Sequence, residues 1–190
     1  RQNPRTDTTP IIAFSSDPAP ARREACLNAG VTEYIVKSSA ALPQLHQALD
    51  RIFGGAAVMT GSLDSGGMRE RGLLFTFLSA KGGTGTSSLC ANLAMTIKEQ
   101  HPDARVVVAD LVLPIGSIGQ IIGYGGQINL ATVANLPSGQ ANGEYFLKNL
   151  PEPELWKFQL LAGSPDPQHA NNLRVERISQ IVDILRGAYD

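Results

Sequence analysis

Apolar residues in the first part of the chain occur alternately in short continuous runs and at helical spacing. The runs TPIIAF at 9–14 and YIV at 34–36 are short and apolar, a pattern that indicates buried strands of a parallel sheet. A helix over 21–29 is predicted between them, because a proline precedes it and a glycine follows it. Leucine and isoleucine then recur at helical spacing over 42–52, with Ser39 available as the N-cap. The predicted order is strand, helix, strand, helix.

The pattern breaks down in the stretch at 54–72, which reads GGAAVMTGSLDSGGMRERG. It has little periodicity and is rich in glycine and serine, a composition typical of flexible linkers. We therefore predict a domain boundary here, with one domain over 1–53 and a second over 73–190.

The second domain again alternates between apolar runs and helical spacing. The run LLFTFL at 73–78 predicts a buried central strand, and RVVVA at 105–109 predicts another. A helix ending near Gln100 lies between them. Short helices at 130–136 and 145–150, a strand at 158–161 and a final helix at 175–185 complete the prediction. Alternation of this kind predicts an α/β fold with a parallel sheet.

Composition and charge narrow the possible functions. The chain has 190 residues, of which 43% are hydrophobic and 17% charged, as in a globular protein with one domain or parts of two. The formal net charge is -1 and no dense run of lysine and arginine is present, so a polyanion is not attracted. Nucleic-acid binding is therefore disfavoured.

Two further observations concern the cellular location. Cys26 and Cys90 are far apart in sequence and lie within apolar helical patterns, which indicates buried reduced thiols and a cytoplasmic protein. No signal-like segment opens the chain, and no apolar run approaches the roughly 20 residues that span a bilayer. We expect any contact with the inner membrane or cell pole to be made through partners.

The segment LSAKGGTGTSS at 78–88 has the properties of a phosphate-binding loop. A predicted strand precedes it and a predicted helix follows it, so backbone N–H groups and the helix dipole point toward an anion. Against the pattern G-x-x-x-x-G-K-[ST], Ala80 replaces the first glycine and Thr86 the lysine, while Ser87 keeps the hydroxyl. A glycine-rich turn without a ligand is the alternative, and the flanking elements favour the phosphate site. The predicted binding residues are Lys81, Gly82, Gly83, Thr84, Gly85, Thr86, Ser87 and Ser88.

The early lysine in K-G-G-x-G resembles the deviant Walker A motif of the ParA/MinD superfamily. The resemblance implies a P-loop domain that binds ATP and Mg²⁺, in which Lys81 reaches the phosphates across an ATP-sandwiched homodimer. The family's acidic strand end, D-x-D, keeps its first acid as Asp110 but has Val112 at the second. By resemblance, Lys81 and Asp110 are catalytic, and Ser87 and Asp110 bind the metal.

Two departures from the family pattern fall on the catalytic parts. Thr86 lacks the ammonium of the usual lysine, a contact worth about 1.5–3 kcal/mol, or about tenfold to a hundredfold in nucleotide affinity. By the resemblance, the second acid helps to position the attacking water, and Val112 cannot accept a hydrogen bond from it. Hydrolysis also depends on electrostatic stabilisation of the transferring phosphoryl group, where loss of one preorganised group costs about 100-fold to 1000-fold in rate. We therefore predict a nucleotide-binding switch with weak or absent hydrolysis.

Within that superfamily, the motifs GTGTS at 83–87 and DLVLPIG at 110–116 are similar to the CpaE/TadZ pilus-assembly proteins, as is LLAGSP at 160–165. This resemblance implies a homodimer that binds assembly proteins of a type IV (Flp/Tad) pilus or secretion machine at the membrane. The family continues after residue 190 into its Walker B strand, so the resemblance also implies truncation there.

The N-terminal segments TPIIAFSSDP and NAGVTEYIVKSS resemble the second half of a flavodoxin-like response-regulator receiver domain. Ser15 falls at the switch position and Lys37 at the phosphate-pairing lysine, although a strand-end hydroxyl and a solvated lysine are an equal alternative. The resemblance implies a partial receiver, truncated at its start, with the phospho-acceptor aspartate upstream of Arg1. CpaE/TadZ proteins place a degenerate receiver before the ATPase-like domain, in this order.

Several alternatives stay open. The three scattered histidines suit surface or packing roles better than catalysis or zinc binding. The run at 113–126 is interpreted as a nucleotide-sensing switch loop, with a plain glycine-rich connection as the alternative. Besides the assembly factor, the candidate functions are an active ParA/MinD-like ATPase that positions DNA or a division complex, and a response regulator with a P-loop output domain.

Overall fold

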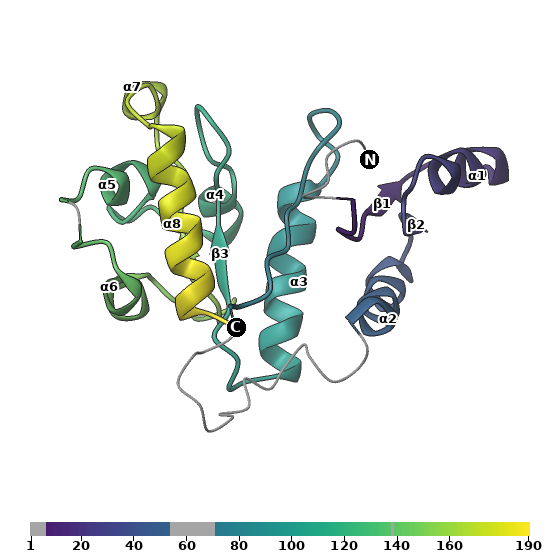
Figure 1. Cartoon of the computed structure of the whole chain (residues 1–190), viewed down its shortest axis with the longest axis horizontal. Helices are drawn as coiled ribbons and strands as arrows, with labels where there is room; N and C mark the ends of the chain where they lie inside the picture. The colour runs from purple at the N-terminus through teal and green to yellow at the C-terminus, as the bar shows by residue number, and fades with distance from the viewer. Residues whose placement is uncertain (1–6, 54–70, 138) are drawn as a thin grey trace. The chain divides into compact units, whose positions relative to one another are not determined.

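The computed structural model describes residues 7–53, 71–137 and 139–190 (Figure 1). They belong to two compact units, one N-terminal and one C-terminal, and each is considered by itself. The division between the units lies within the stretch predicted as a linker. Of that stretch, only Arg71 and Gly72 are among the described residues, and both contact helix α8 of the C-terminal unit.

The N-terminal unit has the predicted order of elements. They are β1 (Ile12–Ser15), α1 (Pro20–Asn28), β2 (Glu33–Val36) and α2 (Ala41–Phe53). The two strands pair in parallel, with Ser15 opposite Val36. The prediction of Ser39 as N-cap is wrong, because α2 begins later and the Ser38 hydroxyl instead accepts the Ala40 N–H (3.3 Å).

The C-terminal unit also combines helices with a parallel pair of strands. Its elements are α3 (Thr86–Gln100), β3 (Val107–Ala109), α4 (Ile118–Ile122), α5 (Leu130–Ala134), α6 (Gly143–Asn149), β4 (Gln159–Leu161), α7 (Pro167–Ala170) and α8 (Val175–Ala188). Val108 lies opposite Leu160 in the parallel ladder. The parallel pairing expected from the α/β alternation is thus confirmed in both units, whereas the short helices α4 and α7 were not predicted.

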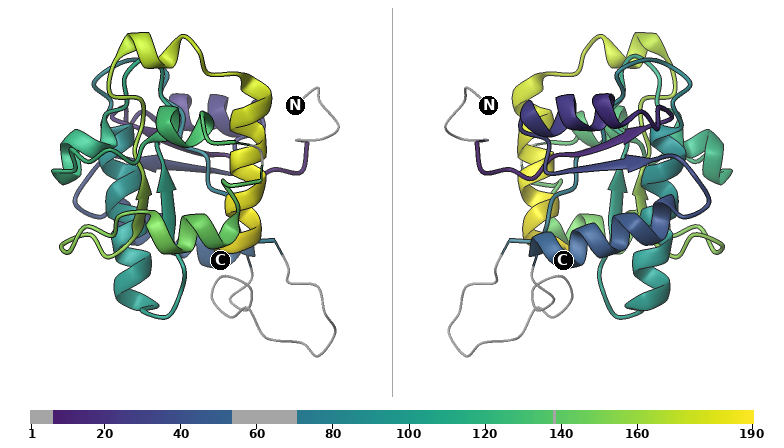
Figure 2. Two further views of the ribbon diagram at one scale, coloured as in Figure 1. Left: turned by 90° about the vertical axis from the view of Figure 1, so that its left-hand side faces the viewer. Right: turned by 90° about the vertical axis from the view of Figure 1, so that its right-hand side faces the viewer.

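Side chains on opposite faces of β3 and β4 belong to two separate apolar clusters. Val108 and Leu160 pack with Ala91 and Ala94 of α3, whereas Leu161 packs on the other face with α8. Figures 1 and 2 accordingly show α3 and α8 on opposite sides of β3. This alternation follows from the period of two in a strand, and it places α3 against one face of the two strands.

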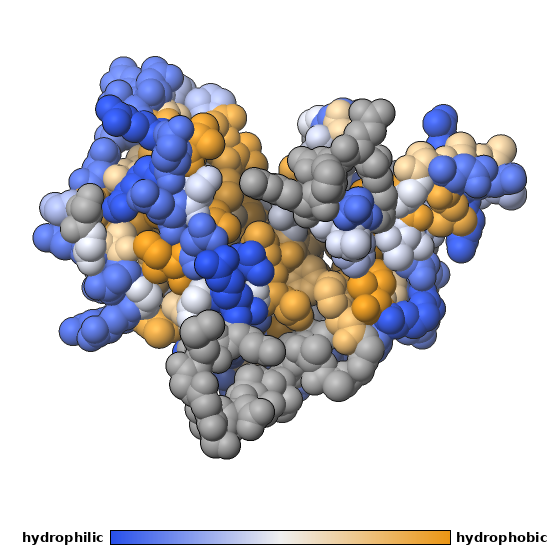
Figure 3. All heavy atoms as spheres, in the orientation of Figure 1, coloured by the Kyte–Doolittle hydropathy of each residue, from blue (hydrophilic) through white to orange (hydrophobic). Residues whose placement is uncertain are grey.

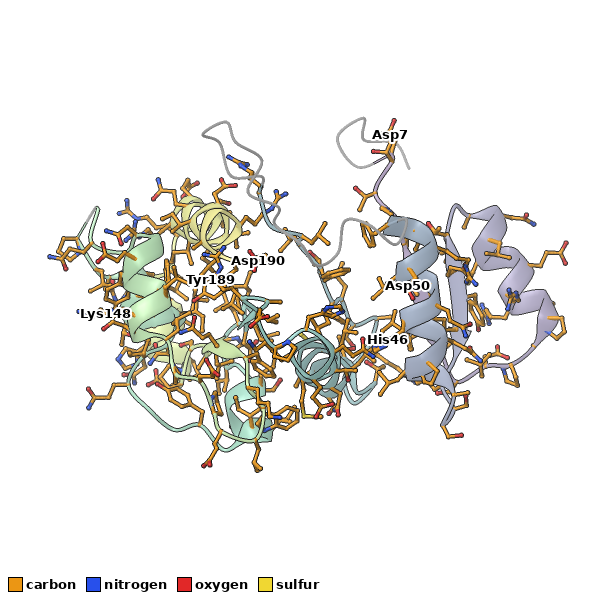
Figure 4. All side chains as sticks on the ribbon, turned by 90° about the horizontal axis from the view of Figure 1, so that it is seen from below. Asp7, His46, Asp50, Lys148, Tyr189 and Asp190 are labelled. Atoms are coloured by element: carbon orange, nitrogen blue, oxygen red, sulfur yellow. The ribbon has the colours of Figure 1, made fainter. Side chains whose placement is uncertain are left out.

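The prediction of a buried central strand at 73–78 is wrong. No strand forms there, and Leu78 is 86% exposed. The reason lies at Asp190, labelled in Figure 4, whose N–H donates to the Arg105 carbonyl (3.0 Å) and whose carbonyl accepts from the Leu73 N–H (2.7 Å). Because Asp190 lies between the two segments, they are about two strand spacings apart, roughly 10 Å, and cannot pair directly. Figure 3 shows apolar surface between α8 and α3 in this unit.

None of the helices within 7–53, 71–137 and 139–190 combines the length and the apolar character needed to cross a membrane.

Candidate functional site

The glycine loop that precedes α3 has an open backbone. Gly83 and Gly85 adopt left-handed conformations, with φ of 74° and 78°, which side chains rarely tolerate. A Cβ placed on Gly82, Gly83 or Gly85 meets no atom within 4 Å. No side chain caps the start of α3, so the N–H groups of its first turn are available to an anion. This loop fits a phosphate group.

Hydroxyl groups hold the glycine loop together from within. The Thr86 hydroxyl, at the position of the usual lysine, lies 2.9 Å from that of Thr84, which lies 2.7 Å from that of Ser79. The Ser79 hydroxyl also contacts the Lys81 carbonyl. The Lys81 residue itself is exposed, as its predicted role in reaching a ligand or a second copy requires. That role stays a prediction.

Asp110, at the end of β3, anchors the loop that follows it. Its side chain is 2% exposed, and Oδ2 accepts the N–H groups of Ser117 (2.7 Å) and Ile118 (2.9 Å). Oδ1 accepts the N–H of Val112 (3.1 Å), whose apolar side chain is 53% exposed. The carboxylate thus shapes the loop and starts α4. The predicted metal and catalytic roles of Asp110 stay predictions, since in this structure its oxygens bind backbone groups.

The loop at 110–118 is also held against the end of β4. A Cβ on Gly116 or on Gly163 would come within 2.6 Å of the other residue's Cα. The Gly116 N–H donates to the carbonyl of Ser164 (3.1 Å), which is itself buried. The predicted switch or connecting stretch therefore begins with an anchored segment and continues into α4. The sequence showed glycines here but no sign that these two would touch.

A pair of hydroxyl groups connects the two loops. Ser87 Oγ, in the first turn of α3, lies 2.7 Å from Ser117 Oγ. Ser87 was predicted to bind the metal, but Ser117 was not among the predicted site residues. Only the fold brings Ser117 to this place, because a serine after a glycine is equally common in plain connecting loops. The structure thereby adds one polar residue to the candidate site.

The surroundings of the site contain no preformed metal cluster. Within the described ranges, no three or more His, Cys, Asp or Glu side chains gather in a group that could hold a metal ion. The Ser87 hydroxyl suits Mg²⁺, which keeps several waters and is commonly bound by one or two protein oxygens together with phosphates. Burial, and to a smaller extent the charge of Asp110, raise the pKa of the Cys90 thiol to about 11, so this cysteine is neutral at physiological pH.

The N-terminal unit brings together two further predicted residues. Ser15 ends β1 and Lys37 follows β2, and the Lys37 N–H donates to the Ser15 carbonyl (2.8 Å). The Ser15 hydroxyl accepts the N–H of Asp17 (3.1 Å). Both residues thus lie at the carboxyl edge of the same sheet, where the receiver resemblance puts them. Their part in a receiver stays a prediction.

Comparison with known proteins supports a likeness to the ParA family at the level of the fold. No protein-family model and no curated protein matches the chain. A solved structure of a ParA family ATPase from Chlorobium tepidum TLS is similar, with 26% identity over 64% of this chain and a TM-score of 0.53. The matched region spans 49% of that protein. The likeness supports a ParA-like P-loop fold, and it singles out neither the CpaE/TadZ branch nor a receiver domain.

Proposed function

We propose that this protein is an ATP-sensing assembly factor of the CpaE/TadZ type, with weak or absent ATP hydrolysis. The observation that carries the proposal is the open glycine loop at the start of α3, with two left-handed glycines and an uncapped helix N-terminus. The likeness to a ParA family ATPase supports the same site. The motifs at 83–87 and 110–116 favour the pilus or secretion branch.

Different residues of the loop would contact the phosphates of ATP, bind Mg²⁺ and supply positive charge. The N–H groups of Gly82 to Gly85 and of the first turn of α3 would surround the phosphates, which supply the negative charge. The Ser87 hydroxyl would bind the metal and Thr86 would offer a neutral hydroxyl to the phosphates. Lys81 would add the positive charge, toward its own nucleotide or that of a second copy.

The same site is poorly equipped for hydrolysis. The Thr86 hydroxyl is already paired with Thr84 and carries no charge to stabilise a transferring phosphoryl group. Val112 is exposed near the site but has no polar group that could orient water. Asp110 uses its oxygens to anchor backbone N–H groups. The site is therefore proposed to register bound ATP rather than to consume it.

The proposed partners are a second copy of this chain and assembly proteins at the membrane. A homodimer bridged by Lys81 and ATP would dock on assembly proteins at the membrane, and the N-terminal receiver-like unit would provide a second docking surface. Such a protein would lie in the cytoplasm and reach the inner membrane or cell pole through these partners. The motif resemblance supports this reading.

An active ParA/MinD-like ATPase is the second candidate, and the likeness to a ParA family ATPase favours it. The two candidates differ in turnover. In the assembly factor, ATP binds and stays bound, whereas in the ATPase it is hydrolysed in a cycle. Measurement of ATP affinity and of phosphate release on the same protein separates them.

The Thr86→Lys variant tests the altered loop directly. We expect ATP affinity to rise about tenfold to a hundredfold, because the ammonium adds a charged contact worth about 1.5–3 kcal/mol. Calorimetric titration with ATP measures the change. Thr96→Ala is the matched control, since its hydroxyl donates to the Asn92 carbonyl one turn earlier in α3 (2.8 Å). Rapid turnover by the unmodified protein would instead favour the ATPase, and failure to bind ATP would reject both candidates.

A further inference from the structure

We propose that Ser117 is a positioning residue for Mg²⁺, acting through the hydroxyl of Ser87. The inference rests on the proposed nucleotide site and adds to it a residue outside the loop motif. The two Oγ atoms lie 2.7 Å apart, within the usual range for a hydrogen bond between hydroxyl groups. Each hydroxyl has one proton and two lone pairs, so either can donate to the other.

Binding of a cation would decide the direction of this hydrogen bond. A metal bound to Ser87 Oγ requires a lone pair directed at it and the hydroxyl proton directed away. Ser117 Oγ is placed to accept that proton. With the proton directed to Ser117, a lone pair of Ser87 would remain for the metal. Hydrogen-bond partners in the second coordination shell orient other metal ligands in the same way.

Ser117 is rigidly placed for this part. Its N–H donates to the buried carboxylate of Asp110 (2.7 Å), and its carbonyl accepts the N–H of Ile121 in α4 (3.2 Å). The preceding residue, Gly116, is packed against Gly163 at the end of β4. The position of the Ser117 hydroxyl is therefore determined by the ends of both strands, and not by the glycine loop itself.

The orientation of the Ser87 hydroxyl would affect Mg²⁺ affinity strongly, because few other protein groups would bind the metal. In the ranges that the structure describes, no group of acidic, histidine or cysteine side chains could hold a metal by itself. Because the oxygens of Asp110 accept backbone N–H groups, the protein's share of the coordination would fall mainly on the neutral hydroxyl of Ser87, together with phosphate oxygens and water. Loss of a partner that orients a metal ligand typically costs about 10-fold to 100-fold in metal affinity.

Removal of the Ser117 hydroxyl tests the inference. The unmodified protein, Ser117→Ala and Ser117→Thr are titrated with Mg²⁺ at a fixed concentration of a fluorescent ATP analogue, and nucleotide affinity is measured again in EDTA. We expect Ser117→Ala to need about tenfold more Mg²⁺ for half-maximal binding. Its affinity in EDTA should equal that of the unmodified protein, and Ser117→Thr should behave like serine. Thr96→Ala again serves as the control for loss of a hydroxyl from α3.

A double-mutant cycle with Ser87→Ala tests whether Ser117 acts on the metal through Ser87. If Ser117 acts through Ser87, its removal should have no further effect on the Mg²⁺ requirement once Ser87 is alanine. If Ser117→Ala does not fold, Ser117→Cys provides the same comparison, because its thiol is a weak acceptor of similar size.

Three results would overturn the inference. Equal Mg²⁺ requirements for serine and alanine at position 117 would show that the hydroxyl does not orient the metal ligand. An equal loss of nucleotide affinity with and without Mg²⁺ would show that Ser117 only shapes the loop. Absence of nucleotide binding in the unmodified protein would overturn the proposed function as well, which distinguishes that failure from the first two.

Discussion

The glycine loop at 79–86 and the loop at 110–118 lie on two sides of one candidate site and are built in different ways. The glycine loop is exposed over most of its length and is held by hydroxyl groups of its own side chains. The second loop is held by the buried carboxylate of Asp110, which accepts N–H groups from Val112, Ser117 and Ile118. No side chain caps the start of α3, which follows the glycine loop, whereas three backbone N–H groups of the second loop donate to Asp110.

The two loops are therefore suited to different tasks. The glycine loop is suited to binding a phosphate, and the loop at 110–118 is suited to positioning a residue that orients a ligand. A phosphate site needs backbone N–H groups that can donate to a ligand, and no side chain caps the start of α3, which follows the first loop. A residue that orients a ligand needs a rigid support, and the second loop has one in Asp110 and in the contact between Gly116 and Gly163. The hydroxyl pair of Ser87 and Ser117 joins the two.

Removal of the Asp110 carboxylate should have the largest effect on stability. We expect Asp110→Ala to lower the free energy of unfolding by about 3–5 kcal/mol, because backbone donors are left without partners in a buried place. Asp110→Asn should cost about half as much, since its remaining oxygen can still accept. Urea unfolding measures both. A loss below about 1 kcal/mol for alanine would mean that the carboxylate does not hold the loop.

Disruption of the close contact between Gly116 and Gly163 should have the second largest effect on stability. A Cβ on Gly163 would lie 2.6 Å from the Gly116 Cα, so Gly163→Ala should lower the free energy of unfolding by about 2–3 kcal/mol. Gly187 near the end of α8 is the matched control, because a Cβ there meets nothing within 4 Å. Gly187→Ala should be neutral or stabilising by about 0.5 kcal/mol. Equal losses for both variants would contradict the contact.

The smallest effect is expected in the glycine loop. Thr84→Val removes the hydroxyl that bridges Ser79 and Thr86, and water can reach the groups it leaves behind. The free energy of unfolding should fall by about 0.5 kcal/mol. The same urea series measures it beside the Asp110 variants. A loss above about 2 kcal/mol would show that the two loops are equally rigid, and would end the distinction between them.

Local pattern was sufficient for most of the elements and for the open backbone of the glycine loop. The apolar periodicity predicted α2, α3 and α8, and the motif at 78–88 identified the glycines that take up left-handed conformations. These features depend on neighbours in sequence, such as helical spacing and backbone freedom at glycine, so they can be recognised without the fold. The parallel pairing in both units also followed from the alternation of strands and helices.

Tertiary structure decided what depends on partners distant in sequence. The run at 73–78 has the composition of a central strand, yet a ladder requires an adjacent strand, and Asp190 separates this run from Arg105. The contact of Ser87 with Ser117 and that of Gly116 with Gly163 each join segments whose spacing in sequence carries no signal. The sequence alone therefore determined the glycine loop and its missing lysine, and predicted a phosphate site there, whereas only the fold showed which residues contact that loop.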